Sequence, residues 1–303
     1  MNTADKSVAK VGTKKKTGLL NLSRVSLVHY VKLAYRSSLF IAMLVVYIIN
    51  KVNGSDIFSL SPHNSDFISA IAANPSVYIV FGIAWVVYVV EMVLRFIPSK
   101  LESPGCQKVF AKNYRPTGSS APLVQRRRTT FLVFLVWCAI NLPFYVFYAL
   151  HRFGVVHIVD DGVMILLSLA YGICDMICIL FFCPFQSWFM KNRCCSTCRI
   201  YNWDFIMMFT PMLPMMYSIY MPFAISLFVI ALALFIVWEI TAAKHPERFS
   251  DKTNKAIQCR YCTEKLCHHK KQLQGFIKRH GAKLDSYLKK VDINSDDDRD
   301  CSC

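Results

Sequence analysis

Two Cys-x-x-Cys motifs flank a long apolar stretch toward the carboxyl end of the chain, and together they could bind a metal ion. Cys195 and Cys198 form the first motif, and Cys259 and Cys262 form the second. The two thiolates of such a motif point to the same side of a tight turn, so two motifs supply the four sulfur ligands of a tetrahedral zinc site. If the intervening stretch crosses a membrane twice, both motifs emerge on the same side. The spacing then predicts one structural zinc ion.

Additional ligands beside the motifs keep other sites open. Cys194 adjoins the first motif, and Cys267 and His268 follow the second. A local zinc site that combines the second motif with Cys267 and His268 is therefore an alternative, although we favour the four-cysteine site. The same thiolates could instead hold an iron–sulfur cluster, act as a redox dithiol, or stay reduced and unligated.

Three charged residues inside apolar runs are a second set of candidates. Asp175 lies within one such run, and Glu91 and Arg95 lie four residues apart in another. A bare charge in hydrocarbon is expensive, so each group must pair, lose its charge or line a wet cavity. Glu91 and Arg95 can pair with each other on one helix face. We expect Asp175 to bear on function, and we expect Asp204, beside a later run, to be solvated at the membrane interface.

The apolar runs have the length of membrane-spanning helices. The chain is 54% hydrophobic, its mean hydropathy is +0.36, and a helix needs about 20 apolar residues to cross the hydrocarbon core. The fifth run is the shortest and contains Pro211 and Pro214, which interrupt helical hydrogen bonding, so a re-entrant segment is an alternative there. Six spans are predicted, at approximately 31–49, 77–96, 130–150, 163–183, 203–218 and 222–240.

Basic residues predict how these spans are oriented. If both termini are cytoplasmic, the cytoplasmic segments hold 32 of the 35 lysines and arginines. That asymmetry is the positive-inside rule, and it favours an even number of crossings. Lys32 and Arg36, at the start of the first span, are expected to extend to the headgroups. We expect a plasma or inner membrane location, contact with anionic inner-leaflet lipids, and no nucleic-acid partner for the net charge of +16.

Composition divides the chain into three parts. Residues 1–30 form a basic cytoplasmic segment, 31–242 form the six-helix transmembrane domain, and 243–303 form a cytoplasmic tail that contains Cys, His and many Lys residues. Within the transmembrane domain, the Pro- and Gly-containing loop 97–129 is typical of a flexible basic connector, and loop 184–202 carries the first cysteine motif. An amphipathic pattern in the tail is typical of a surface helix or of packing in a homo-oligomer.

These patterns predict an all-α polytopic membrane protein with about six transmembrane helices and a small cysteine-rich, metal-binding region on its cytoplasmic face. Our first hypothesis is a small transporter, channel or sensor with Asp175 in its interior. The alternatives are a membrane-bound redox or electron-transfer protein that uses the cysteine motifs, and a non-catalytic scaffold whose tail recruits a partner. The sequence contains no phosphate-binding loop, nucleophile elbow, metalloprotease or dinucleotide motif, so an enzyme is not favoured.

Overall fold

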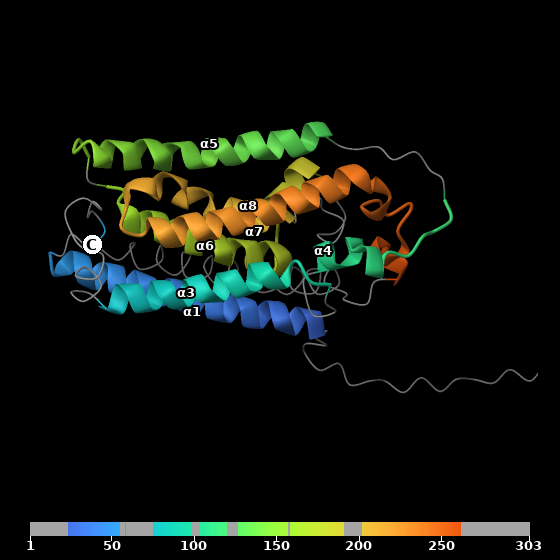
Figure 1. Ribbon diagram of the computed structural model, residues 1–303, viewed down its shortest axis with the longest axis horizontal. Helices are drawn as coiled ribbons and strands as arrows, with labels where there is room; N and C mark the ends of the chain where they lie inside the picture. Colours follow the sequence, from blue (N-terminus) through green and yellow to red (C-terminus); the bar gives the residue numbers. More distant parts are fainter. Residues whose placement is uncertain are drawn as a thin grey trace, which may run out of the picture.

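The computed structural model of this protein describes residues 24–54, 58, 75–98, 104–119, 127–156, 158–190 and 202–261. Within these ranges the chain forms helices and no strand. Five helices lie in one bundle (Figure 1) and are long and apolar enough to cross a membrane. The prediction of an all-helical fold is thereby confirmed, with five candidate membrane-spanning helices in the described residues where about six were predicted. The five are α1 (Arg24–Val52), α3 (Pro75–Leu94), α5 (Arg127–Arg152), α6 (Asp161–Leu180) and α8 (Met221–Lys244).

A sixth segment runs along the bundle as two short helices. The α-helix α7 (Asp204–Phe209) continues directly into the 3₁₀ helix η6 (Thr210–Tyr217). A 3₁₀ helix rises about 2.0 Å per residue against about 1.5 Å in an α-helix, so the two together cover about 25 Å. Pro211 and Pro214 lie within η6. They explain the change of helix type, because proline cannot donate the backbone hydrogen bond that continues an α-helix.

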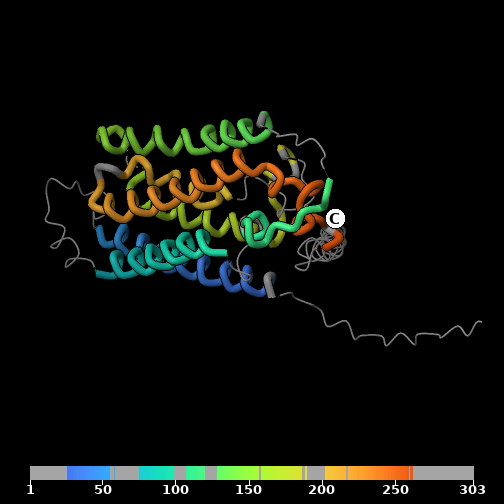
Figure 2. Tube along the Cα trace, turned by 45° about the vertical axis from the view of Figure 1, so that its right-hand side comes forward, coloured from blue at the N-terminus to red at the C-terminus, as the bar shows by residue number. Residues whose placement is uncertain are grey.

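Successive segments of the bundle alternate in direction, so the first helix begins at the same end of the bundle at which the last helix finishes. We name the two ends of the bundle after residues that lie there, the Arg36 end and the Asp160 end. At the start of α7, Asp204 pairs with Arg95 near the Arg36 end, whereas Ser218, directly after η6, donates to Asp161 at the Asp160 end. The first turn of α1 and the last turn of α8 therefore both lie at the Arg36 end (Figures 1 and 2).

Aromatic side chains fill the bundle between its ends. Tyr88 packs edge to face on Phe209 with ring centroids 5.4 Å apart, and Phe81 packs in the same way on Tyr220 at 5.7 Å. The outer faces are apolar as well, which suits lipid and would be costly in water. On α3, for example, the outward residues recur at helical spacing and are about half exposed: Ile79, Ile83, Val86, Val90 and Val93.

Residues 104–119 and 246–261 fold together at the Arg36 end, and we call them the end module. Asn254 is fully buried. Its side-chain amide donates to the carbonyl oxygens of Lys108 at 3.2 Å and Arg248 at 2.8 Å, and its oxygen accepts from the backbone N–H of Ala256 at 3.0 Å. The described part of loop 97–129 is therefore structured, in contrast to the flexible connector that was predicted, because its partner lies far along the chain. The module contains α4 (Pro104–Val109), η2 (Ala111–Asn113), η7 (Pro246–Arg248), η8 (Lys255–Ile257) and η9 (Cys259–Tyr261). At the same end a π-helix, η3 (Phe185–Met190), packs against α5.

Candidate functional site

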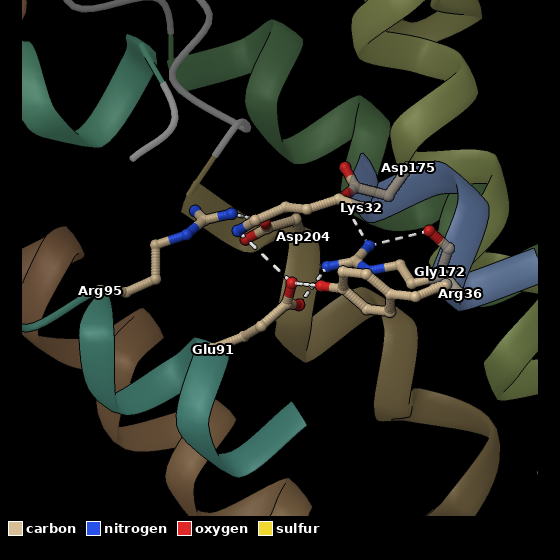
Figure 3. Close-up of polar contacts among 8 residues, drawn as sticks. Lys32, Arg36, Glu91, Arg95, Gly172, Asp175 and Asp204 are labelled. Atoms are coloured by element: carbon tan, nitrogen blue, oxygen red, sulfur yellow. Dashed lines mark hydrogen bonds and ion pairs between the residues drawn. The ribbon is translucent and has the colours of Figure 1, made fainter. Parts of the chain in front are cut away.

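The Arg36 side chain lies inside the bundle, fully removed from solvent. Its Nη1 donates to the Gly172 carbonyl oxygen at 2.8 Å and to Oδ2 of Asp175 at 3.2 Å, both on α6. Its Nη2 lies 2.5 Å from Oε2 of Glu91 on α3. One guanidinium group on α1 thereby connects three helices (Figure 3).

The other oxygen of the Glu91 carboxylate faces two more groups on α1. The Tyr35 hydroxyl donates to Oε1, and Nζ of Lys32 lies 3.4 Å from the same oxygen. Lys32, Tyr35 and Arg36 share one helix face because they are three and four residues apart. Two cations and a hydroxyl from a single face of α1 therefore surround one buried carboxylate.

A second ion pair lies beside the first and involves α7. Nη2 of Arg95 is 2.6 Å from Oδ2 of Asp204, and both side chains are almost completely buried. The Arg95 guanidinium also lies over the Phe205 ring, 5.0 Å from its centroid. The expectation that Asp204 is solvated at an interface is therefore wrong, because α7 begins inside the protein, packed against α6 and α8.

These side chains form one charge network at the Arg36 end of the bundle. Ionised, it contains three cations and three anions, so its charges sum to zero. Removing an ion from water costs several kcal/mol, and close partners with good hydrogen bonds can offset that cost. Mutual pairing is thus the physical reason why so many charges tolerate an apolar interior. The charge network consists of Lys32, Arg36, Glu91, Arg95, Asp175 and Asp204.

Gly172 allows the close approach that the charge network needs. A Cβ at this position would lie well inside van der Waals contact of the Tyr88 hydroxyl. Without that carbon, the Tyr88 ring can pack against α6, and the Arg36 guanidinium lies over the ring at 5.3 Å from its centroid. The glycine also leaves its carbonyl oxygen open to Arg36.

A second polar cluster lies at the Asp160 end. Asp160 is the N-cap of α6, and its side chain accepts from the backbone N–H of Val163 at 3.0 Å. Nζ of Lys51, in the last turn of α1, is 2.6 Å from Oδ2 of Asp160. The Tyr47 hydroxyl donates to the same oxygen at 3.3 Å. This carboxylate therefore fastens the end of α1 to the start of α6.

The next residue, Asp161, connects two further segments. Its Oδ1 accepts from the Tyr148 hydroxyl of α5 at 2.7 Å, and its Oδ2 accepts from the Ser218 hydroxyl after η6. This cluster was not among the sites predicted from the sequence. An Asp directly before an apolar run is a helix N-cap signal that could have located Asp160. We call the group the Asp160 cluster: Tyr47, Lys51, Tyr148, Asp160, Asp161 and Ser218.

The structure brings together the three charged residues that the sequence singled out. Asp175, Glu91 and Arg95 all belong to the charge network, and Glu91 and Arg95 each have a partner on another segment. Arg36 does not extend to the headgroups as predicted. It turns inward and pairs with carboxylates on α3 and α6.

The cysteine motifs lie almost entirely outside the described residues. This holds for the predicted ligands Cys195, Cys198 and Cys262 and for the alternates Cys194, Cys267 and His268, whereas Cys259 begins η9. Among the residues that the structure describes, no group of three or more His, Cys, Asp or Glu side chains is arranged to hold a metal ion.

The fold and the site together define a class, a polytopic helical membrane protein with charged groups buried at both ends of its bundle. The chain matches no protein-family model, no curated protein and no solved structure.

Proposed function

We propose that this protein is a small membrane transporter or channel whose two ends are held closed by the charge network and the Asp160 cluster. The observation that carries the proposal is the Arg36 guanidinium, which is fully buried and shared between carboxylates of α3 and α6. A buried ion pair between helices is either formed or broken, because charged groups that separate must each find another partner or water. Intramembrane charges of this kind commonly mark substrate or ion pathways.

Both closing contacts act on the same two helices. Arg36 and Lys51 lie on α1, and their partners Asp175 and Asp160 belong to α6 and its N-cap. If α1 and α6 tilt apart at one end, the contact at that end breaks and the contact at the other end can stay intact. A transporter needs this property, since both ends must not open together.

We assign the Arg36 end to the cytoplasm of a plasma or inner membrane. The end module lies there, and most of its charged side chains are basic. The positive-inside rule favours this orientation, and the basic groups would then face anionic inner-leaflet lipids. The exposed or half-exposed cations of the module are Lys108, Lys112, Arg115, Arg248, Lys252, Lys255 and Arg260.

Thiol labelling from each side of the membrane tests the gating proposal. Ala84 lies on the buried face of α3 between the two polar clusters. We expect an Ala84→Cys reporter to react poorly with a membrane-impermeant maleimide when both ends are intact. Adding Lys51→Met should expose the reporter from the Asp160 end, and adding Arg36→Met should expose it from the Arg36 end. Peptide mass spectrometry separates the reporter from the native cysteines.

Lys244→Met serves as the control for loss of a cation, since Lys244 is exposed at the end of α8. Val155→Cys and Lys112→Cys, both exposed, report labelling at the Asp160 end and the Arg36 end respectively. The proposal is contradicted if these two sites react while Ala84→Cys stays unreactive in every variant. Reaction of Lys112→Cys from outside intact cells would reverse the assigned orientation.

A structural zinc ion on the cytoplasmic face remains part of the proposal. It is supported by the fold, because residues Met190 and Asn202 on either side of the first motif, and η9 at the second, all belong to segments at the Arg36 end. Elemental analysis of the purified protein should find about one zinc per chain, lost in a Cys195→Ser, Cys259→Ser double variant. Iron with visible absorbance would favour the redox alternative instead.

A further inference from the structure

One face of α6 carries a polar group every seven residues. Asp161, Ser168 and Asp175 are separated by two helical turns each, about 10.5 Å at 1.5 Å per residue. Asp161 and Ser168 are each 1% exposed, and Asp175 contacts the buried Arg36. This face therefore runs inside the protein from the Asp160 cluster to the charge network, with a hydroxyl at its midpoint.

Two buried hydroxyl groups along this face lack a partner. In the described part of the chain, neither Oγ of Ser168 nor the hydroxyl of Tyr88 has a hydrogen-bond partner. Both side chains are 1% exposed. An unsatisfied buried hydroxyl costs about 1–3 kcal/mol, so two of them in one region point to a bound polar species that they contact.

The Tyr88 hydroxyl is placed against the charge network. It lies over Gly172, whose carbonyl oxygen accepts from Arg36, and the Tyr88 ring lies beneath the Arg36 guanidinium. Ser168 is one turn before Gly172 on the same helix face. The two hydroxyls thus occupy the interval between the midpoint of α6 and the carboxylate of Asp175.

Hydroxyl groups also continue the polar face at the Asp160 end. The Ser218 hydroxyl donates to Asp161 and accepts from the backbone N–H of Tyr220. The Tyr220 ring stacks on that of Tyr78, with ring centroids 5.6 Å apart. Burial raises the pKa of Tyr220 above its ordinary value, so this hydroxyl keeps its proton.

From these observations we infer that the α6 face is a proton path, and that protons are the ions that the proposed transporter moves. A proton enters at the Asp161 carboxylate, passes through water held by the Ser168 and Tyr88 hydroxyls, and binds the Asp175 carboxylate. Protonated Asp175 has lost its charge and its attraction for Arg36, so the Arg36 end loosens. Release of the proton on that side restores the carboxylate and the ion pair.

The groups around Asp175 favour this assignment over a site for a neutral solute. Arg36 comes from α1, Glu91 and Tyr88 from α3, and Asp204 from α7. Because Arg36 also pairs with Glu91, its guanidinium keeps one carboxylate partner when Asp175 is protonated. Proton binding therefore weakens one contact of Arg36 without stranding a buried charge.

Proton flux into liposomes tests the inference directly. Protein reconstituted with a trapped pH-sensitive dye should acidify the interior when a potassium diffusion potential is imposed. We expect Asp175→Asn to abolish the flux, and Ser168→Ala and Tyr88→Phe each to reduce it about tenfold or more, as loss of a positioned proton-transfer group does. Ser168→Thr, which keeps the hydroxyl, should retain flux. Thr241→Ala on the outside of α8 is the matched control.

A loss of flux in Ser168→Ala would not result from misfolding. This variant removes a hydroxyl that no described side chain binds, so we expect its unfolding temperature to be unchanged. Wild-type flux no greater than that of empty liposomes overturns the inference, as does normal flux in both Ser168→Ala and Tyr88→Phe. The inference rests on the proposed function, but the two fail separately. If the Ala84→Cys reporter still responds to Arg36→Met and Lys51→Met while proton flux is absent, the gating proposal stands and only the proton path is lost.

Discussion

Nη1 of Arg36 lies 3.2 Å from Oδ2 of Asp175. Fifteen residues further along α1, Nζ of Lys51 lies 2.6 Å from Oδ2 of Asp160, which precedes Asp175 by the same fifteen residues. Equal separations on two antiparallel segments mean that both contacts belong to one register of α1 against α6. Fifteen residues span about 22 Å in an α-helix, most of the hydrocarbon core. Sliding one helix past the other would break both contacts, whereas tilting them apart at one end breaks only one.

Removing the Arg36 charge should be strongly destabilising. Arg36→Met leaves the buried Glu91 carboxylate and the partly buried Asp175 carboxylate short of a partner, which typically costs about 3–5 kcal/mol in free energy of unfolding. Chemical unfolding in detergent micelles measures this, with the exposed Lys244→Met as the control. A loss no larger than the control's would show that the charge network does not hold the helices together.

Removing the Lys51 charge should cost much less. The Lys51 side chain is 40% exposed, and ion pairs accessible to solvent contribute about 1 kcal/mol or less. Asp160→Asn should cost a similar amount, since asparagine still caps a helix. Because the two residues share one contact, the Lys51→Met, Asp160→Asn double variant should be no less stable than the worse single variant. Fully additive losses would indicate that the pair contributes nothing by itself.

Two glycines allow a matched test of helix packing. Gly172→Ala should destabilise the protein by about 1–3 kcal/mol, because the added methyl group collides with the Tyr88 hydroxyl. Gly82→Ala on α3 meets nothing within 4 Å, so it should be neutral or stabilise by up to about 1 kcal/mol through helix propensity. Unfolding of both variants under the same conditions gives the comparison. Equal effects would argue against a close approach at Gly172.

Loss of the Asn254 side chain should release the end module. Asn254→Ala leaves the carbonyl oxygens of Lys108 and Arg248 without their donor, at a cost of about 1–3 kcal/mol for a buried group. Hydrogen–deuterium exchange should then accelerate in residues 104–119 and stay unchanged in α6. Asn53→Ala, at an exposed position, is the control. Unchanged exchange in 104–119 would show that other contacts suffice to hold the module.

Several features of this protein were predictable from sequence because they depend on local pattern. Apolar runs of spanning length predict α1, α3, α5, α6 and α8, since lipid requires every backbone hydrogen bond to be made within the helix. The high cost of charge in hydrocarbon likewise singled out Asp175, Glu91 and Arg95 as residues that need partners.

The identity of those partners depended on tertiary structure. Nothing near Arg36 in sequence shows that it turns toward α3 and α6, and nothing near residue 104 shows that Asn254 will hold that loop. Each contact joins segments dozens of residues apart, and its energy depends on the distance and solvent exclusion that packing creates. Residue type and helical spacing thus decided which charges must be buried and which helices form, whereas the register of α1 against α6 decided which cation meets which carboxylate.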